Sequence, residues 1–80
     1  MKISIDDLRN SGIPYRIMGS RSLLSRELSD VQVGEYLVVP FKYASISNIK
    51  KTVSGINARG EATFQYDNSG SEYSFIVRTA

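Results

Sequence analysis

The sequence contains no cysteine, no histidine and no tryptophan. Without cysteine, neither a disulfide nor a thiolate metal site can form. Without histidine, the Ser-His-Asp and Cys-His catalytic arrangements are excluded, and so are zinc sites built on these ligands. The chain also has no phosphate-binding loop and no dinucleotide fingerprint. Because general acid–base catalysis lacks most of its usual titrating groups here, we expect a protein that is not an enzyme and that needs no metal or cofactor.

Long apolar segments are also missing. The longest apolar run, Tyr36–Phe41, is far too short to span a bilayer. The first residues include acids where a signal peptide would have an apolar run. The lack of cysteine fits a reducing compartment. We therefore expect a protein of the cytoplasm with no membrane association.

Eighty residues predict a single domain over residues 1–80. A chain of this length buries about 60% of the surface that it exposes when unfolded. Its stability must come from one small core of aliphatic and aromatic residues, with oligomerisation as a further source.

The first part of this domain, residues 1–30, predicts a short helix followed by an irregular segment. Ser4 with Asp7 three residues later is an N-cap signature, and Gly12 can end a helix over residues 1–12. Residues 13–18 could form a short strand. The leucines that follow could form one helical turn, or the segment could be an ordered loop. The residues concerned are Leu23, Leu24 and Leu28.

Residues 31–80 predict the element order β-α-β-β. Tyr36–Val39 is typical of a buried strand, ended by Pro40. A helix over residues 45–59 can begin at a serine cap, either Ser45 or Ser47, and can end at a glycine. Its apolar residues fall within about 80° of the helical wheel. This predicted core stripe consists of Ile46, Ile49, Val53 and Ile56.

Two alternating segments complete the chain. Residues 61–67 place Phe64 and Tyr66 on one face, and residues 72–79 alternate in the same way around the turn D-N-S-G-S. The predicted fold class is therefore α+β, in which a short N-terminal helix precedes a three-stranded, mostly antiparallel sheet packed on one helix.

The charge distribution points to one part of the surface. The net charge is only +2, but the segment from Lys42 to Arg59 contains lysines and an arginine and no acid. Tyrosine is a favoured anchor at protein interfaces, and Tyr15, Tyr43 and Tyr73 are candidates for exposure. We predict a partner-binding set made of basic and tyrosine side chains. Its members are Lys42, Tyr43, Lys50, Lys51, Arg59, Tyr73 and Arg78.

Residues 28–80 resemble a group of small tailed-phage proteins of unknown function. The resemblance rests on Val33-Gly34-Glu35, the strand Tyr36–Pro40, the helix and the hairpin that ends in Ile76-Val77-Arg78. It implies a phage or prophage origin with a small accessory role. The chain departs from the group in lacking a basic arm ahead of this segment and a tryptophan in the last strand.

Three functions fit these observations. The first is an accessory protein that binds and blocks a host protein, as host-defence inhibitors of the anti-CRISPR type do. The second is nucleic-acid binding, in which the lysines of the helix over residues 45–59 contact phosphates and Tyr43 stacks on an unpaired base. The third is a structural part that forms a homodimer through an exposed edge strand.

Overall fold

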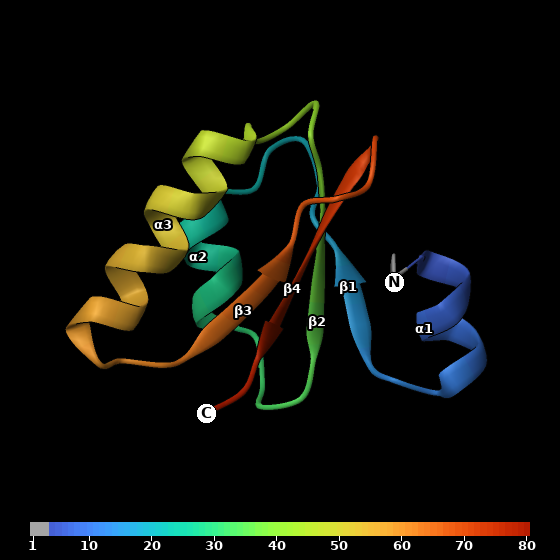
Figure 1. Cartoon of the computed structure of the whole chain (residues 1–80), viewed down its shortest axis with the longest axis horizontal. Helices are drawn as coiled ribbons and strands as arrows, with labels where there is room; N and C mark the ends of the chain where they lie inside the picture. The colour runs from blue at the N-terminus through green and yellow to red at the C-terminus, as the bar shows by residue number, and fades with distance from the viewer. Residues whose placement is uncertain (1–3) are drawn as a thin grey trace.

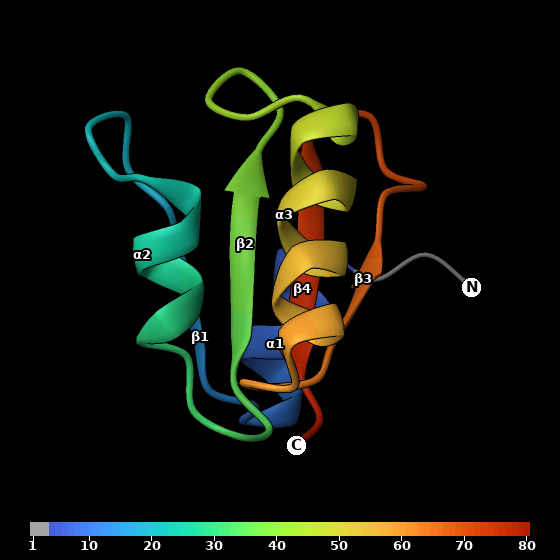
Figure 2. The same ribbon diagram turned by 90° about the vertical axis from the view of Figure 1, so that its left-hand side faces the viewer.

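Helices cover both faces of one sheet in the computed structural model, which describes residues 4–80. Figure 1 shows α2 (Leu24–Ser29) and α3 (Ile46–Arg59) on one face of the sheet and α1 (Ile5–Ser11) on the other. The view in Figure 2 places α2 and α3 in front of the sheet and α1 behind it. The α+β class is confirmed, but the predicted layout with one covering helix is wrong.

The sheet has four strands, not the predicted three. Its order is β1 (Tyr15–Ile17), β2 (Tyr36–Pro40), β4 (Tyr73–Arg78) and β3 (Phe64–Asp67). β1 pairs in parallel with β2, and the other pairs are antiparallel, so the sheet is mixed. The additional strand lies within residues 13–18, where a short strand was one of the expectations, but the predicted three-stranded sheet did not include it. Its three residues are too few to show a strand period, and it becomes a strand by pairing with β2.

Two separate apolar clusters follow from this layering. Under α2 and α3, Leu37 and Val39 of β2 pack with Ile76 of β4 and the buried residues of both helices. On the opposite face, Leu8 of α1 packs against Val38 and Phe75. The prediction of one small core is therefore wrong. The uninterrupted apolar run in β2 is typical of a strand buried on both faces.

Local signals set the ends of α1. Ser4 and Asp7 form a reciprocal capping box, and Gly12 ends the helix in the left-handed conformation with φ 71°. A residue without a Cβ adopts this conformation most readily. The helix predicted over residues 1–12 is confirmed for residues 5–11, and the first three predicted positions lie outside the described residues.

The segment left open between helix and loop contains α2. Leu24 and Leu28 are buried between α2 and the sheet. Leu23 precedes the helix and is 65% exposed. The four-residue spacing of the two buried leucines places them on one face of the helix. Residues 13–30 therefore contain a strand, a loop and a helix.

The predicted core stripe of α3 is confirmed at three of its four positions. Ile49, Val53 and Ile56 are buried, but Ile46 is 42% exposed. Ser45 is the N-cap, which makes Ile46 the first residue of the helix. The chain enters α3 with buried Ala44 in the same cluster as Ile49, an arrangement known as a hydrophobic staple. Because Ala44 fills the core at this end of the helix, Ile46 faces solvent.

Gly55 lies within α3 although no neighbour requires a glycine there. A Cβ added at this position would meet Arg59 Nη1 at 3.5 Å, an ordinary van der Waals distance. Since glycine costs about 1 kcal/mol relative to alanine inside a helix, we expect Gly55→Ala to raise the free energy of unfolding by up to that amount. The corresponding rise in Tm is about 4–8 °C for a domain of this size, and thermal unfolding followed by circular dichroism measures it. A fall in Tm would contradict this packing.

Candidate functional site

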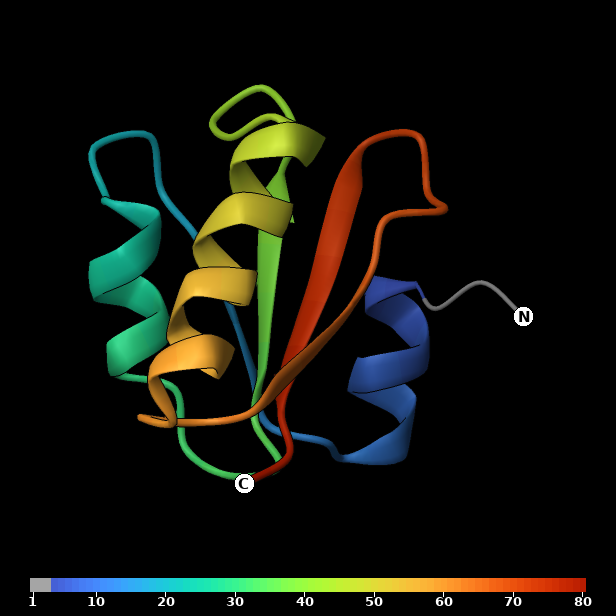
Figure 3. The ribbon, with the colours of Figure 1, turned by 60° about the vertical axis from the view of Figure 1, so that its left-hand side comes forward.

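The predicted binding residues lie in three places, not one. Three loops lie at the same end of the molecule, formed by residues 18–23, 41–45 and 68–72 (Figure 3). Lys42, Tyr43 and Tyr73 lie at or beside this end. Lys50 and Lys51 lie on the exposed surface of α3, and Arg59 and Arg78 lie at the other end of the helix and of β4.

The best-formed part of the set lies where the chain enters α3. The Lys42 ammonium lies 5.1 Å from the centroid of the Tyr43 ring, within the range of a cation–π contact. Tyr43 is 40% exposed and Ile46 is 42% exposed. Lys50 follows Ile46 by four residues and so lies on the same side of the helix. We call Lys42, Tyr43, Ile46 and Lys50 the α3 entry surface.

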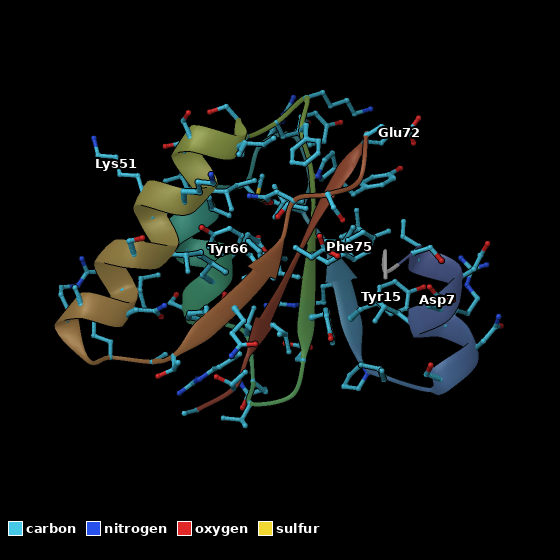
Figure 4. All side chains as sticks on the ribbon, in the orientation of Figure 1. Asp7, Tyr15, Lys51, Tyr66, Glu72 and Phe75 are labelled. Carbon is cyan, nitrogen blue, oxygen red and sulfur yellow. The ribbon has the colours of Figure 1, made fainter. Side chains whose placement is uncertain are left out.

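A hollow of about 440 Å³ adjoins this surface. It lies between the loop that follows β2 and the turn that precedes β4, and is lined by Pro40, Phe41, Lys42, Ser71, Glu72 and Tyr73. Lys42 and Glu72 bring opposite charges to its walls. Figure 4 shows Glu72 at the beginning of β4, at this end of the sheet. The mixed charge suits a protein surface better than a phosphate backbone, which Glu72 would repel.

Tyr15 and Tyr73 are less exposed than predicted. Both are partly buried and pack against the cluster of Leu8, Val38 and Phe75. Each ring is therefore part of the core on the α1 face, although Tyr73 also lines the hollow.

Hydrogen bonding to Tyr15, and the nearby charge of Asp6, raise the pKa of Arg9.

Lys51 points away from the sheet in Figure 4. It is exposed, as is Lys50. The two side chains diverge by about 100° because they are adjacent on a helix. Only Lys50 lies on the side of α3 that continues the α3 entry surface.

Arg59 and Arg78 have partners within the chain. Arg59 Nε lies 2.9 Å from Glu61 Oε1 in an exposed ion pair. Arg78 donates from Nη1 to the Val31 carbonyl at 3.1 Å and from Nε to the Ala80 carbonyl at 3.0 Å. The bond to Val31 ties the end of β4 to the chain ahead of β2. The structure thus gives Arg78 a structural role, and it separates both arginines from the α3 entry surface.

Within residues 4–80, no group of three or more acidic residues could hold a metal ion. No helix in this part of the chain has the length and apolar character needed to cross a membrane.

Comparison of the chain with protein-family models, curated proteins and solved structures gives no match.

Ile46 and Tyr66 are exposed although the sequence predicts neither as a site residue. The sequence predicts Ile46 as a core residue, because it fits the apolar stripe of α3. Tyr66 on β3 is 38% exposed on the face that α3 covers. The sequence does contain a signal for Ile46. If Ser45 caps the helix, the residues that form the hydrophobic staple are Ala44 and Ile49. Ile46 is then not needed to fill the core at this end of the helix.

Proposed function

We propose that this protein is a non-enzymatic, phage-type accessory protein of the host cytoplasm that binds and blocks a host protein. The α3 entry surface is the observation that carries this proposal. It combines an exposed aromatic ring and an exposed isoleucine with two lysines, in a segment without acids. Aromatic and apolar anchors surrounded by charged groups are typical of protein interfaces.

The charges indicate the chemistry of the partner surface. Lys42 and Lys50 flank the apolar residues Tyr43 and Ile46, and the first turn of α3 contains no acidic residue. A partner that offers an apolar depression rimmed by aspartate or glutamate would complement this arrangement. An interface of about 800 Å² on each partner would suffice for specific binding, so a small domain can block a larger protein.

Nucleic-acid binding is the second candidate, because Lys42, Lys50 and Lys51 are all exposed. Two cations of the predicted set also have partners within the chain, since Arg59 forms an exposed ion pair with Glu61 and Arg78 donates to backbone carbonyls. Glu72 lines the same hollow as Lys42. We expect the three lysines to supply only weak phosphate contact.

Substitutions on the α3 entry surface should separate these two functions. We expect Tyr43→Ala and Ile46→Ser each to weaken capture of the host partner about tenfold, equivalent to about 1.4 kcal/mol. Tagged protein would be incubated with host lysate treated with nuclease, at low and at high salt. Apolar anchors lose little affinity with salt, whereas phosphate contacts lose affinity steeply.

The matched control is Val33→Ser. Val33 is 62% exposed and lies in the connection ahead of β2, at the opposite end from the three loops. Its substitution should leave capture unchanged. If nuclease abolishes capture, the partner is a nucleic acid. If Val33→Ser weakens capture as much as Tyr43→Ala does, the α3 entry surface is not the interface.

A further inference from the structure

The outer edge of β3 differs at its two ends. At Phe64 the edge is closed by a side chain: Asn57 Oδ1 accepts from the Phe64 N–H at 2.9 Å, and Asn57 Nδ2 donates to the Phe64 carbonyl at 3.1 Å. This amide makes the same pair of bonds that a neighbouring strand would make. The position that such a strand would occupy is therefore filled at Phe64 by α3.

Two residues further along, the edge is open. In an antiparallel pair, successive residues point their backbone groups alternately toward and away from the neighbouring strand. Since the Phe64 groups face Asn57, those of Gln65 face β4 and those of Tyr66 face outward. β3 is the last strand of the sheet formed by residues 4–80, so no further strand of this part of the chain covers Tyr66.

The side of α3 that faces β3 carries a positive charge. Asn57 and Lys50 are seven residues apart, and at about 100° per residue they lie within about 20° of each other on α3. The side of α3 that reaches β3 through Asn57 therefore also carries Lys50. Measured from the Asn57–Phe64 contact, Lys50 is about 10 Å along the helix, and Tyr66 is about 7 Å along the strand. Helix and strand run in opposite directions in the chain, so both steps lead the same way (Figure 3).

We propose that the open edge of β3 at Tyr66 binds an extended, acidic segment of a partner protein, which adds a strand to the sheet beside α3. Main-chain bonds to Tyr66 would hold the segment, and Lys50 would select its charge. The inference rests on the proposed function, because it takes the partner to be a protein and adds a second contact beyond the α3 entry surface.

The charge of α3 argues against a second copy as the occupant. If two β3 edges paired about Tyr66, the lysine-bearing sides of the two α3 helices would both border the new pair of strands. Between Ile46 and Arg59 there is no acid to offset them. An acidic segment has the complementary charge, and like charges brought together at an interface are unfavourable.

Peptide titration followed by amide NMR tests this site. The probe is a synthetic six-residue peptide alternating glutamate and valine, and its control alternates lysine and valine. We expect the acidic peptide to shift the amide resonances of β3, most strongly at Tyr66, and the basic peptide to bind at least fivefold more weakly. If neither peptide shifts β3 at millimolar concentration, or if both bind equally, the proposal is wrong.

Two substitutions at one position isolate the backbone contact. Tyr66→Pro removes the outward N–H, and an edge strand tolerates proline where that group faces away from the sheet. Tyr66→Val removes the ring but keeps the N–H. We expect Tyr66→Pro to bind the acidic peptide about tenfold more weakly than Tyr66→Val does. Equal affinity of the two variants would overturn the strand-addition geometry.

Two further variants keep the test decisive if the proline variant does not fold. Lys50→Glu should weaken acidic-peptide binding about fivefold, the range of an exposed charge contact. Asn57→Ala should strengthen it, because the Phe64 groups then become available. The outcome also separates the two proposals. Loss of host-protein capture with Tyr43→Ala but no peptide binding at β3 leaves the proposed function standing and removes only this inference.

Discussion

Replacing Leu8 with alanine should lower the free energy of unfolding by about 3 kcal/mol, the middle of the range for a fully buried leucine. Leu8 is 1% exposed and packs with Val38 and Phe75 on the sheet face opposite α3. It is the buried residue of α1. Removing it leaves the helix without its main contact to the sheet and leaves a cavity over Val38.

The expected loss is large relative to the whole. At about 0.1 kcal/mol per residue, a domain of this size has a total stability near 8 kcal/mol. A loss of 3 kcal/mol corresponds to a fall in Tm of about 12–24 °C. Urea unfolding followed by circular dichroism would measure it, with Leu23→Ala as the control because Leu23 is 65% exposed. A Leu8→Ala variant as stable as that control would show that α1 does not stabilise the sheet.

The helix ends could be predicted because their signals are local. Ser4 and Gly12 bound α1 as predicted, and α3 begins at Ser45, one of the two predicted caps, and ends at Gly60. A capping side chain bonds to backbone only a few residues away, so the pattern is complete within a short window. The same holds for the hairpin of β3 and β4, whose turn lies between two alternating segments.

The place of β1 in the sheet and the second core could not be predicted in this way, although a short strand within residues 13–18 was expected. β1 has three residues, and its partner in β2 is about twenty residues further along the chain. One signal was nevertheless present. The run Tyr36–Val39 is apolar without alternation, which is typical of a strand covered on both faces. This run therefore indicates that a second layer covers the other face of the strand. Leu8 of the N-terminal helix is the residue that provides this cover.

The site residues divide along similar lines. Lys42 and Tyr43 are in contact in the loop that leads to the N-cap at Ser45. The sequence predicts Arg78 as an interface residue by its charge alone, and in the structure its side chain donates to the Val31 carbonyl. A charged residue type does not reveal whether its partner is a carbonyl of the same chain. That distinction requires the contact between two segments 47 residues apart.

Asn57→Ala should destabilise the protein by about 2 kcal/mol, since two hydrogen bonds are lost at about 1 kcal/mol each. Both bonds join α3 to the Phe64 backbone, and the Phe64 side chain is buried at 4% exposure. The loss therefore affects the attachment of helix to strand as well as the polar groups themselves. Thermal and urea unfolding measure the change.

The control is Asn48→Ala, an exposed asparagine of the same helix whose side chain is not part of the α3–β3 contact. It should change stability by less than about 0.5 kcal/mol. Asn57→Asp tests the two hydrogen bonds separately. A carboxylate still accepts from the Phe64 N–H, but it cannot donate to the Phe64 carbonyl. It should be at least as unstable as Asn57→Ala, since the ionised group also lies against the Phe64 carbonyl oxygen. If Asn57→Ala were as stable as Asn48→Ala, the Asn57 amide would not hold β3 to α3, and the closed end of this edge would be open as well.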